Sequence, residues 1–231
     1  MATSEIKTAI LGNVYPRSNC EKYSYTGTEM VLTWQDRIRN FNYFINGNLS
    51  FEQSKFEYSP QLPKAYPWMS RLGDPVGMTY GYVADGIFQS QEEIDMADCV
   101  YGGNKANIKP GYIRYVDVNH DGEINSKDRV ILGNSTPRYE YSFTLGGQWK
   151  GIDLSLFFQG VGKRDLYYSG AGARPLVQNS TIFKSQLDTW SPENPDAEYP
   201  LLLVDAGSTN MNNIVSSFWI KSGAYLRLKN L

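Results

Sequence analysis

Residues 141–149 read YSFTLGGQW and, after a short Lys-Gly turn, residues 152–160 read IDLSLFFQG. Apolar and polar residues alternate through both segments, with Phe157 as the one mismatch. An alternation of period two is typical of a β-strand that presents one apolar and one polar face. The two segments and their short connection therefore predict an antiparallel β-hairpin.

A second hairpin is predicted nearer the start, from residues 30–35 and 41–52 with a turn over 36–40. Its second segment, FNYFINGNLSFE, alternates for twelve residues. Strands of globular proteins usually have ~5–6 residues, whereas a tilted strand needs ~9–11 to cross a bilayer. Aromatic residues also stand near the predicted strand ends, as in the interfacial girdles of membrane barrels. They are Trp34, Phe41, Phe51, Tyr141 and Trp149.

Two architectures give this alternation. A soluble antiparallel sandwich buries one face of each sheet. A transmembrane β-barrel turns the apolar face to lipid and the other face to a wet lumen. The pattern alone leaves both open; the strand length and the Asn, Ser, Thr and Gln residues on the second face favour the barrel.

Composition excludes several other classes. The net charge of −2 and the pI of about 5.5 argue against an electrostatic nucleic-acid binder. One His and two distant Cys residues form neither a zinc motif nor a disulfide framework. No nucleophile-elbow or phosphate-loop motif occurs, so we expect no enzyme. The sequence shows neither a signal-peptide pattern nor an apolar run near the ~18 residues of a membrane helix.

The stretches 59–138 and 164–223 are rich in Pro, Gly and charge and lack long alternation. Connections of this length are unusual in compact domains but normal in outer-membrane barrels, whose loops are long on one side. Within them SQEEIDMA, residues 90–97, predicts one short helix with Ser90 as N-cap and Glu92 and Glu93 in its first turn.

Residues 117–128, DVNHDGEINSKD, match the ligand spacing of an EF-hand loop, with Gly122 at the sixth place. Oxygen ligands at positions 1, 3, 5, 7, 9 and 12 suit calcium. They would be Asp117, Asn119, Asp121, the carbonyl of Glu123, Asn125 and Asp128. Ile124 is expected to pack against neighbouring apolar groups. The preceding GYIRYV reads as a strand, so we expect a structural Ca²⁺ rather than a sensor. A metal-free Asp/Asn/Gly turn is the open alternative.

Four motifs in fixed order carry a family resemblance. They are YGYVADGIFQSQEEID at 80–95, the run KPGYIRYVDVNHDG to GKRDLY at 109–167, LDTWSPENPDAEYP at 187–200 and GAYLRLKNL at 223–231. With them the chain resembles the C-terminal part of the SusC/RagA-type TonB-dependent transporters of Bacteroidota outer membranes.

The resemblance implies an all-β fold: an antiparallel transmembrane β-barrel segment with long extracellular loops, one short helix and the calcium loop. Residues 1–231 would belong to a ~22-stranded plugged barrel, with the signal peptide and plug upstream and the final strands beyond. The implied function is import of oligosaccharides or peptides across the outer membrane. The implied partners are membrane lipid, a SusD-like surface lipoprotein and, through the absent N-terminal part, TonB. A soluble β-rich carbohydrate-binding or interaction module with a structural calcium loop remains the alternative.

Overall fold

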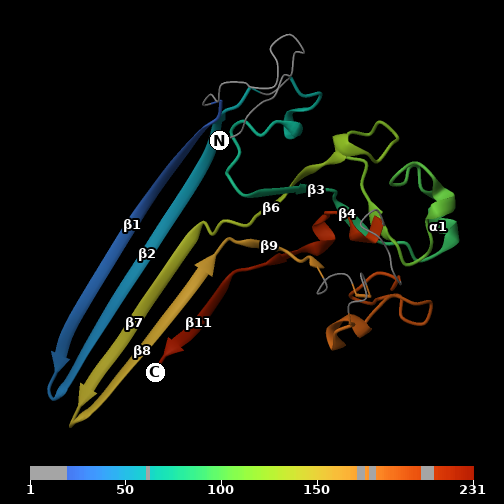
Figure 1. Cartoon of the computed structure of the whole chain (residues 1–231). Coiled ribbons are helices and arrows are strands. Elements are labelled where there is room, and N and C mark those ends of the chain that lie inside the picture. Colours follow the sequence, from blue (N-terminus) through green and yellow to red (C-terminus); the bar gives the residue numbers. More distant parts are fainter. Residues whose placement is uncertain (1–19, 61–62, 171–174, 177–180, 204–210) are drawn as a thin grey trace.

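A long antiparallel sheet forms one half of the molecule (Figure 1). The computed structural model describes residues 20–60, 63–170, 175–176, 181–203 and 211–231. The sheet has five strands in the order β1-β2-β7-β8-β11. They are β1 (Lys22–Ile38), β2 (Phe41–Tyr58), β7 (Tyr139–Trp149), β8 (Ile152–Gly162) and β11 (Tyr225–Asn230).

Both predicted hairpins are confirmed, as β1–β2 and β7–β8. The first strand is much longer than predicted, because pairing continues from Ile38 opposite Phe41 to Lys22 opposite Tyr58, beyond the apolar alternation. The connection between these strands is also tighter than the predicted turn, with Arg39 at φ 54°. Lys150 and Gly151 both have positive φ, as a two-residue hairpin turn requires.

The register places most apolar residues of the five strands on one face. Ile45, for example, lies opposite Trp34 on one side and Leu145 on the other. Directly paired residues of antiparallel strands share a face, so these side chains form one continuous apolar surface, and many of them are exposed. The exposed members include Met30, Leu32, Trp34, Ile45, Leu49, Leu145, Trp149, Ile152, Leu154, Leu226 and Leu228.

The opposite face of the sheet is mainly polar. Asn42 donates to Gln148 Oε1 at 3.4 Å and Asn48 donates to Ser142 Oγ at 3.3 Å, both across the β2–β7 pair. Phe44 is an exception: its ring lies over Gly146, where an added Cβ would come within 2.1 Å of the ring. The predicted division into an apolar and a polar face is therefore present across the sheet.

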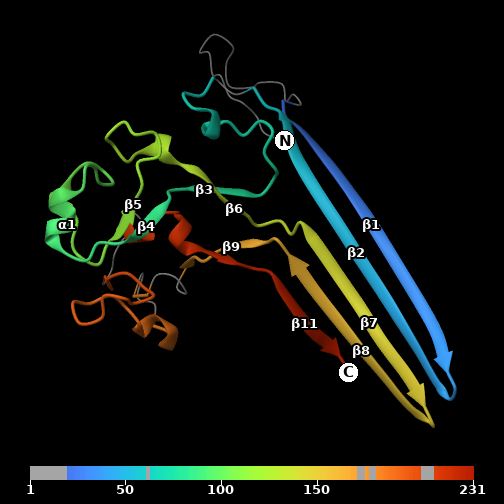
Figure 2. The same cartoon turned by 180° about the vertical axis from the view of Figure 1, so that it is seen from behind.

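The second half of the molecule, which we call the loop module, consists of the described residues within 59–138 and 164–223 (Figure 2). It contains three two-stranded sheets and the helix α1 (Gln91–Met96). The strand pairs are β3 (Met78–Gly81) with β6 (Val130–Asn134), β4 (Ala84–Ile87) with β5 (Ile113–Tyr115), and β9 (Asp165–Tyr167) with β10 (Ile220–Ser222). Short 3-10 turns lie at Pro67–Met69, Lys105–Asn107, Ser126–Asp128, Lys184–Leu187, Met211–Asn213 and Ser217–Trp219.

The two connections share one hydrophobic core, which corrects the expectation of irregular loops. Phe88, Ile94 and Ile113 from the first connection pack in one cluster with Tyr199 and Trp219 from the second. Ile94 and Ile113 have no exposed surface. The core of the protein thus lies in the loop module and not against the long sheet.

The predicted helix is confirmed as α1. Ser90 is its N-cap: its side chain accepts a hydrogen bond from the Glu93 amide at 3.2 Å. The Glu93 side chain in turn accepts from the amide of Gln89, the residue before the N-cap, at 2.9 Å. Within the described ranges, no helix is long and apolar enough to cross a membrane.

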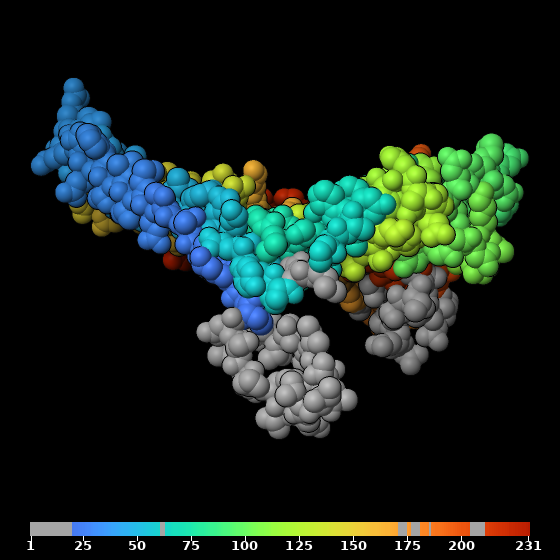
Figure 3. Space-filling model, turned by 90° about the horizontal axis from the view of Figure 1, so that it is seen from above, coloured from blue at the N-terminus to red at the C-terminus, as the bar shows by residue number. Residues whose placement is uncertain are grey.

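The loop module and the hairpin turns lie at opposite ends of an elongated molecule. In Figure 1 the β1–β2 and β7–β8 turns stand together at the lower left, and the module stands at the upper right. Figure 3 shows the same elongation from above, with blue residues of the first hairpin at one end and green residues around α1 at the other. Any site in the module is therefore a full strand length from the turns.

Candidate functional site

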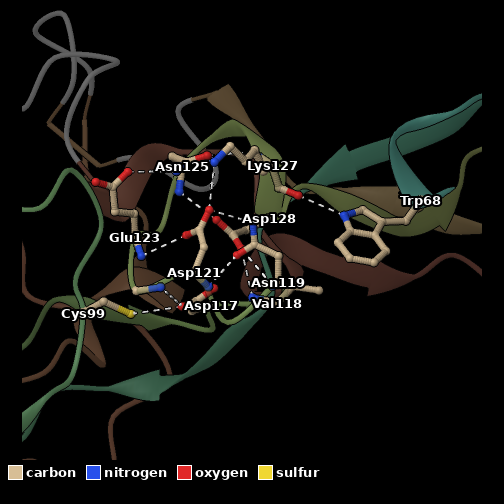
Figure 4. Close-up of polar contacts among 11 residues, drawn as sticks. Trp68, Cys99, Asp117, Val118, Asn119, Asp121, Glu123, Asn125, Lys127 and Asp128 are labelled. Atoms are coloured by element: carbon tan, nitrogen blue, oxygen red, sulfur yellow. Dashed lines mark hydrogen bonds and ion pairs between the residues drawn. The ribbon is translucent and has the colours of Figure 1, made fainter. Parts of the chain in front are cut away.

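The predicted calcium loop connects β5 to β6, and Asp128 lies at its centre (Figure 4). Asp128 has no exposed surface. Its Oδ1 accepts hydrogen bonds from the Val118 and Asn119 amides at 2.9 and 3.3 Å, and its Oδ2 accepts from the Asn125 amide at 2.8 Å. Three backbone donors compensate this buried carboxylate, as burial of a charge requires.

Asp117 has one satisfied and one unsatisfied oxygen. Its Oδ2 accepts from the Gly122 amide at 2.8 Å and lies 3.9 Å from Cys99 Sγ. Its Oδ1 is buried, and no described residue donates a hydrogen bond to it. Gly122 adopts φ 84°, which permits the sharp turn expected at the sixth loop position. Asp117 therefore retains an acceptor without a donor among the described residues.

Asp121 is held by a cation of the protein itself. Its Oδ2 accepts from Lys127 Nζ and from Asn119 Nδ2, each at 2.9 Å, and its Oδ1 accepts from the Glu123 amide at 3.1 Å. The hydrogen bond from Lys127 is the main reason that the pKa of Asp121 lies below its usual value. Asn125 completes the loop by accepting from the Lys127 amide at 2.9 Å.

The donor set suits a hard cation only in part. The Asp, Asn and carbonyl oxygens are those that calcium prefers, and Asp117 Oδ1 is available. Asp128 Oδ1, however, already uses both lone pairs on amides, and Lys127 already neutralises Asp121. In the described part of the chain, no three His, Cys, Asp and Glu side chains are grouped to hold a metal. Calcium binding by this loop stays a prediction.

The loop is fixed to the rest of the module by contacts that the sequence did not indicate. Trp68 Nε1 donates to the Lys127 carbonyl at 2.9 Å, and Tyr66 stacks on Trp68 with ring centroids 4.7 Å apart. Ile124 is 4% exposed and belongs to the hydrophobic core, as predicted from its place in the loop. The loop is thus packed on both sides.

We predict that Asp128→Asn destabilises the loop module by about 1–3 kcal/mol, because an amide group would face at least one backbone N–H donor with a donor of its own. Thermal unfolding and protease cleavage within 117–128 measure this effect. Asp98→Asn, at an exposed position of the same module, is the matched control. Equal stability of the two variants would contradict the central role of Asp128.

The chain is similar to two curated receptors of Formosa agariphila. It is 31% identical to TonB-dependent receptor P3 over 166 residues, which cover 70% of this chain and 15% of that protein. It is 29% identical to TonB-dependent receptor P26 over 161 residues, which cover 69% of this chain and 16% of that protein. The chain thus spans less than a fifth of the length of either relative. No protein-family model matches the chain.

Solved structures show the same fold. The match to the RagAB peptide transporter covers 96% of this chain and 24% of the transporter chain, with a TM-score of 0.61 and 16% sequence identity. The match to the RagAB peptide importer in its closed-closed state covers the same fractions of the two chains, with a TM-score of 0.58. Both curated relatives are named receptors. The chain therefore belongs to the TonB-dependent receptors of the bacterial outer membrane, and it shares the fold of the RagAB transporter.

Proposed function

We propose that the five-stranded sheet is a piece of the wall of a transmembrane β-barrel through which nutrients enter the cell. The observation that supports it is the continuous, exposed apolar face of the sheet, from Met30 on β1 to Leu228 on β11. In a soluble sandwich that face would be the core, whereas here the core lies in the loop module. Lipid contact accounts for an exposed apolar face with a polar face behind it.

The loop module would then lie on the cell surface. All the long connections leave the same end of the sheet, and the other end carries only short turns. Outer-membrane barrels place long loops outside and short turns in the periplasm. A SusD-like lipoprotein, the partner that the resemblance to SusC/RagA-type transporters implies, would contact this module. Energy would come from TonB.

The proposed cargo is an oligosaccharide or a peptide. The test compares cells with and without the gene, grown on an oligosaccharide mixture or a peptide mixture as sole carbon source. We expect loss of growth on one of the two, restored by the gene and abolished again without TonB. Equal growth of all strains on both mixtures would overturn the import function. Purification in mild detergent should also recover a surface lipoprotein, and its absence would overturn the partnership.

A second proposal assigns a calcium ion to residues 117–128. It is supported by the ligand types at the six EF-hand positions and by the unsatisfied Asp117 Oδ1. The ion would engage Asp117, Asn119, Asp121, the Glu123 carbonyl and Asn125, with Asp128 holding the loop in shape. Lys127 would have to leave Asp121, since a cation already occupies that carboxylate.

Lys127→Ala is therefore expected to strengthen calcium binding roughly two- to fivefold, because it removes a competing positive charge at an exposed ion pair. Calorimetric titration of the receptor purified in detergent measures the affinity. Lys109→Ala, at an exposed lysine outside the loop, should leave the affinity unchanged. Absence of binding at millimolar calcium in all three proteins would refute the metal site and leave the import proposal intact.

A further inference from the structure

A cavity of about 700 Å³ lies where the outer ends of β1 and β2 meet the loop module. Tyr23 and Phe56 line it from the two strands, and Ser126 and Arg129 line it from the end of the 117–128 loop. It is separate from the apolar sheet face and from the oxygen ligands proposed for calcium. Neither proposed function assigns it a role.

Three cationic side chains line this cavity: Lys64, Arg71 and Arg129. Both arginines contact Tyr80. The Cζ of Arg71 lies 5.3 Å from the centroid of the Tyr80 ring, and Arg129 Nη2 donates to the Tyr80 carbonyl at 3.1 Å. Among the described residues, neither Lys64 nor Arg71 has a side-chain hydrogen bond or an ion pair. Their donors are therefore available to a ligand.

The two carboxylates of the cavity do not neutralise these cations directly. Glu21 Oε2 accepts from the Tyr23 hydroxyl at 2.6 Å, and Asp74 Oδ2 accepts from the Tyr80 hydroxyl at 2.9 Å. Burial and the neighbouring Asp74 raise the pKa of Tyr80 to about 12, so this hydroxyl remains a neutral donor at physiological pH. Three cations and two carboxylates leave one net positive charge in a chain whose overall net charge is −2.

Two aromatic side chains also line the cavity. Tyr23 and Phe56 pack with ring centroids 4.8 Å apart, and Phe56 is 8% exposed. A small ligand with an anionic group and a flat or apolar body would match both the cationic and the aromatic side chains of the lining. Arg offers two parallel N–H donors to a carboxylate, which gives direction as well as charge.

We propose that this cavity binds the carboxylate group of a small ligand, held by Arg71 and Arg129, with Tyr23 and Phe56 against the ligand body. The carboxylate could belong to a uronic acid or to the C-terminus of a peptide, because both present the same planar oxygen pair. The inference concerns equilibrium binding and does not depend on import.

The test uses the receptor purified from outer membranes in detergent and four probes. Two carry carboxylates: a trimeric oligouronate and an N-acetylated tripeptide with a free C-terminus. The other two are their uncharged counterparts, a neutral trisaccharide and the tripeptide amide. We expect saturable binding of at least one carboxylate probe, at least about tenfold weaker binding of its uncharged counterpart, and weakening by added salt. The probe that binds identifies the source of the carboxylate.

Arg71→Gln and Arg129→Gln should each weaken that binding about tenfold, the usual effect of removing one charged hydrogen-bond partner. Arg227→Gln is the matched control, because Arg227 also lies over a tyrosine ring, 4.9 Å from the centroid of Tyr225, but lines no part of this cavity. Thermal unfolding checks that the variants fold. If Arg129→Gln does not fold, the affinity of Arg71→Gln alone tests the proposal. Failure of both carboxylate probes to bind, or unchanged affinity in Arg71→Gln, would overturn the proposal.

Discussion

Ile113→Ala is expected to lower the unfolding free energy of the loop module by about 2–5 kcal/mol, the usual cost of truncating a fully buried aliphatic side chain. Ile113 has no exposed surface and lies on β5 within the hydrophobic core. Its amide also donates to Asn212 Oδ1 at 2.9 Å, which joins the first connection to the second. Loss of the side chain should therefore loosen both connections together.

Protease digestion of outer membranes that contain the variant measures this effect. Cleavage within 63–138 and 181–203 should rise together, while β7 and β8 remain protected in the sheet. Ile131→Ala, on β6 at a side chain that is 38% exposed, is the matched control and should behave like the unaltered protein. A cleavage pattern of Ile113→Ala identical to that of this control would show that the module has no shared core.

Gly111→Ala is expected to destabilise the module by roughly 2–6 kcal/mol, from two independent causes. Gly111 has φ +91°, which a residue with a Cβ adopts only under strain. An added Cβ would also lie 2.4 Å from Trp190 Cε3 and 2.6 Å from Leu201 Cβ. The backbone cannot easily move away, because Gly111 donates to the Phe88 carbonyl at 2.7 Å and accepts from the Leu201 amide at 2.8 Å.

Gly73→Ala separates the two causes. Gly73 has a similar φ of +95°, but no atom lies within 4 Å of the position of its Cβ. The substitution Gly73→Ala should therefore lower the stability only through backbone strain, by roughly 1–3 kcal/mol. Thermal unfolding of both variants in detergent gives the comparison. If the two lose the same stability, the packing of Trp190 and Leu201 against Gly111 is not a constraint.

The long strands were predictable because their pattern is local. Alternation from Phe41 to Phe51 and from Tyr141 to Trp149 is visible in any short window, and it reports directly which face each residue takes. The extension of β1 back to Lys22 could not be predicted in this way. Residues 22–29 pair with β2 through their backbone, but their side chains do not alternate cleanly between apolar and polar.

The core of the loop module could not be predicted from the sequence, since its contacts join distant residues. The Tyr82 amide donates to the Val215 carbonyl at 3.0 Å, and the Ser217 amide donates to the Tyr82 carbonyl at 2.9 Å. Tyr115 likewise hydrogen-bonds the Met211 carbonyl. No periodicity in these stretches indicates such partners, which lie 96 or more residues away along the chain.

The tight turn of the 117–128 loop was predictable from the sequence, but the charge pairing within the loop was not. The spacing of Asp, Asn and Gly indicated a tight, oxygen-rich loop, which the structure contains. The spacing did not reveal that Lys127 would pair with Asp121, or that Asp128 would be buried under three backbone donors. Those features depend on how the 3-10 turn at Ser126–Asp128 directs neighbouring side chains.

Labelling of single cysteines in living cells tests most directly that the sheet spans the outer membrane with the loop module outside. The two native cysteines, Cys20 and Cys99, are first replaced by serine. Lys109→Cys then marks the loop module and Asn40→Cys marks the β1–β2 turn, both at exposed positions. A membrane-impermeant maleimide should label the Lys109→Cys protein in intact cells, and the Asn40→Cys protein only after the outer membrane is permeabilised. Labelling of both in intact cells, or of the turn alone, would contradict the account.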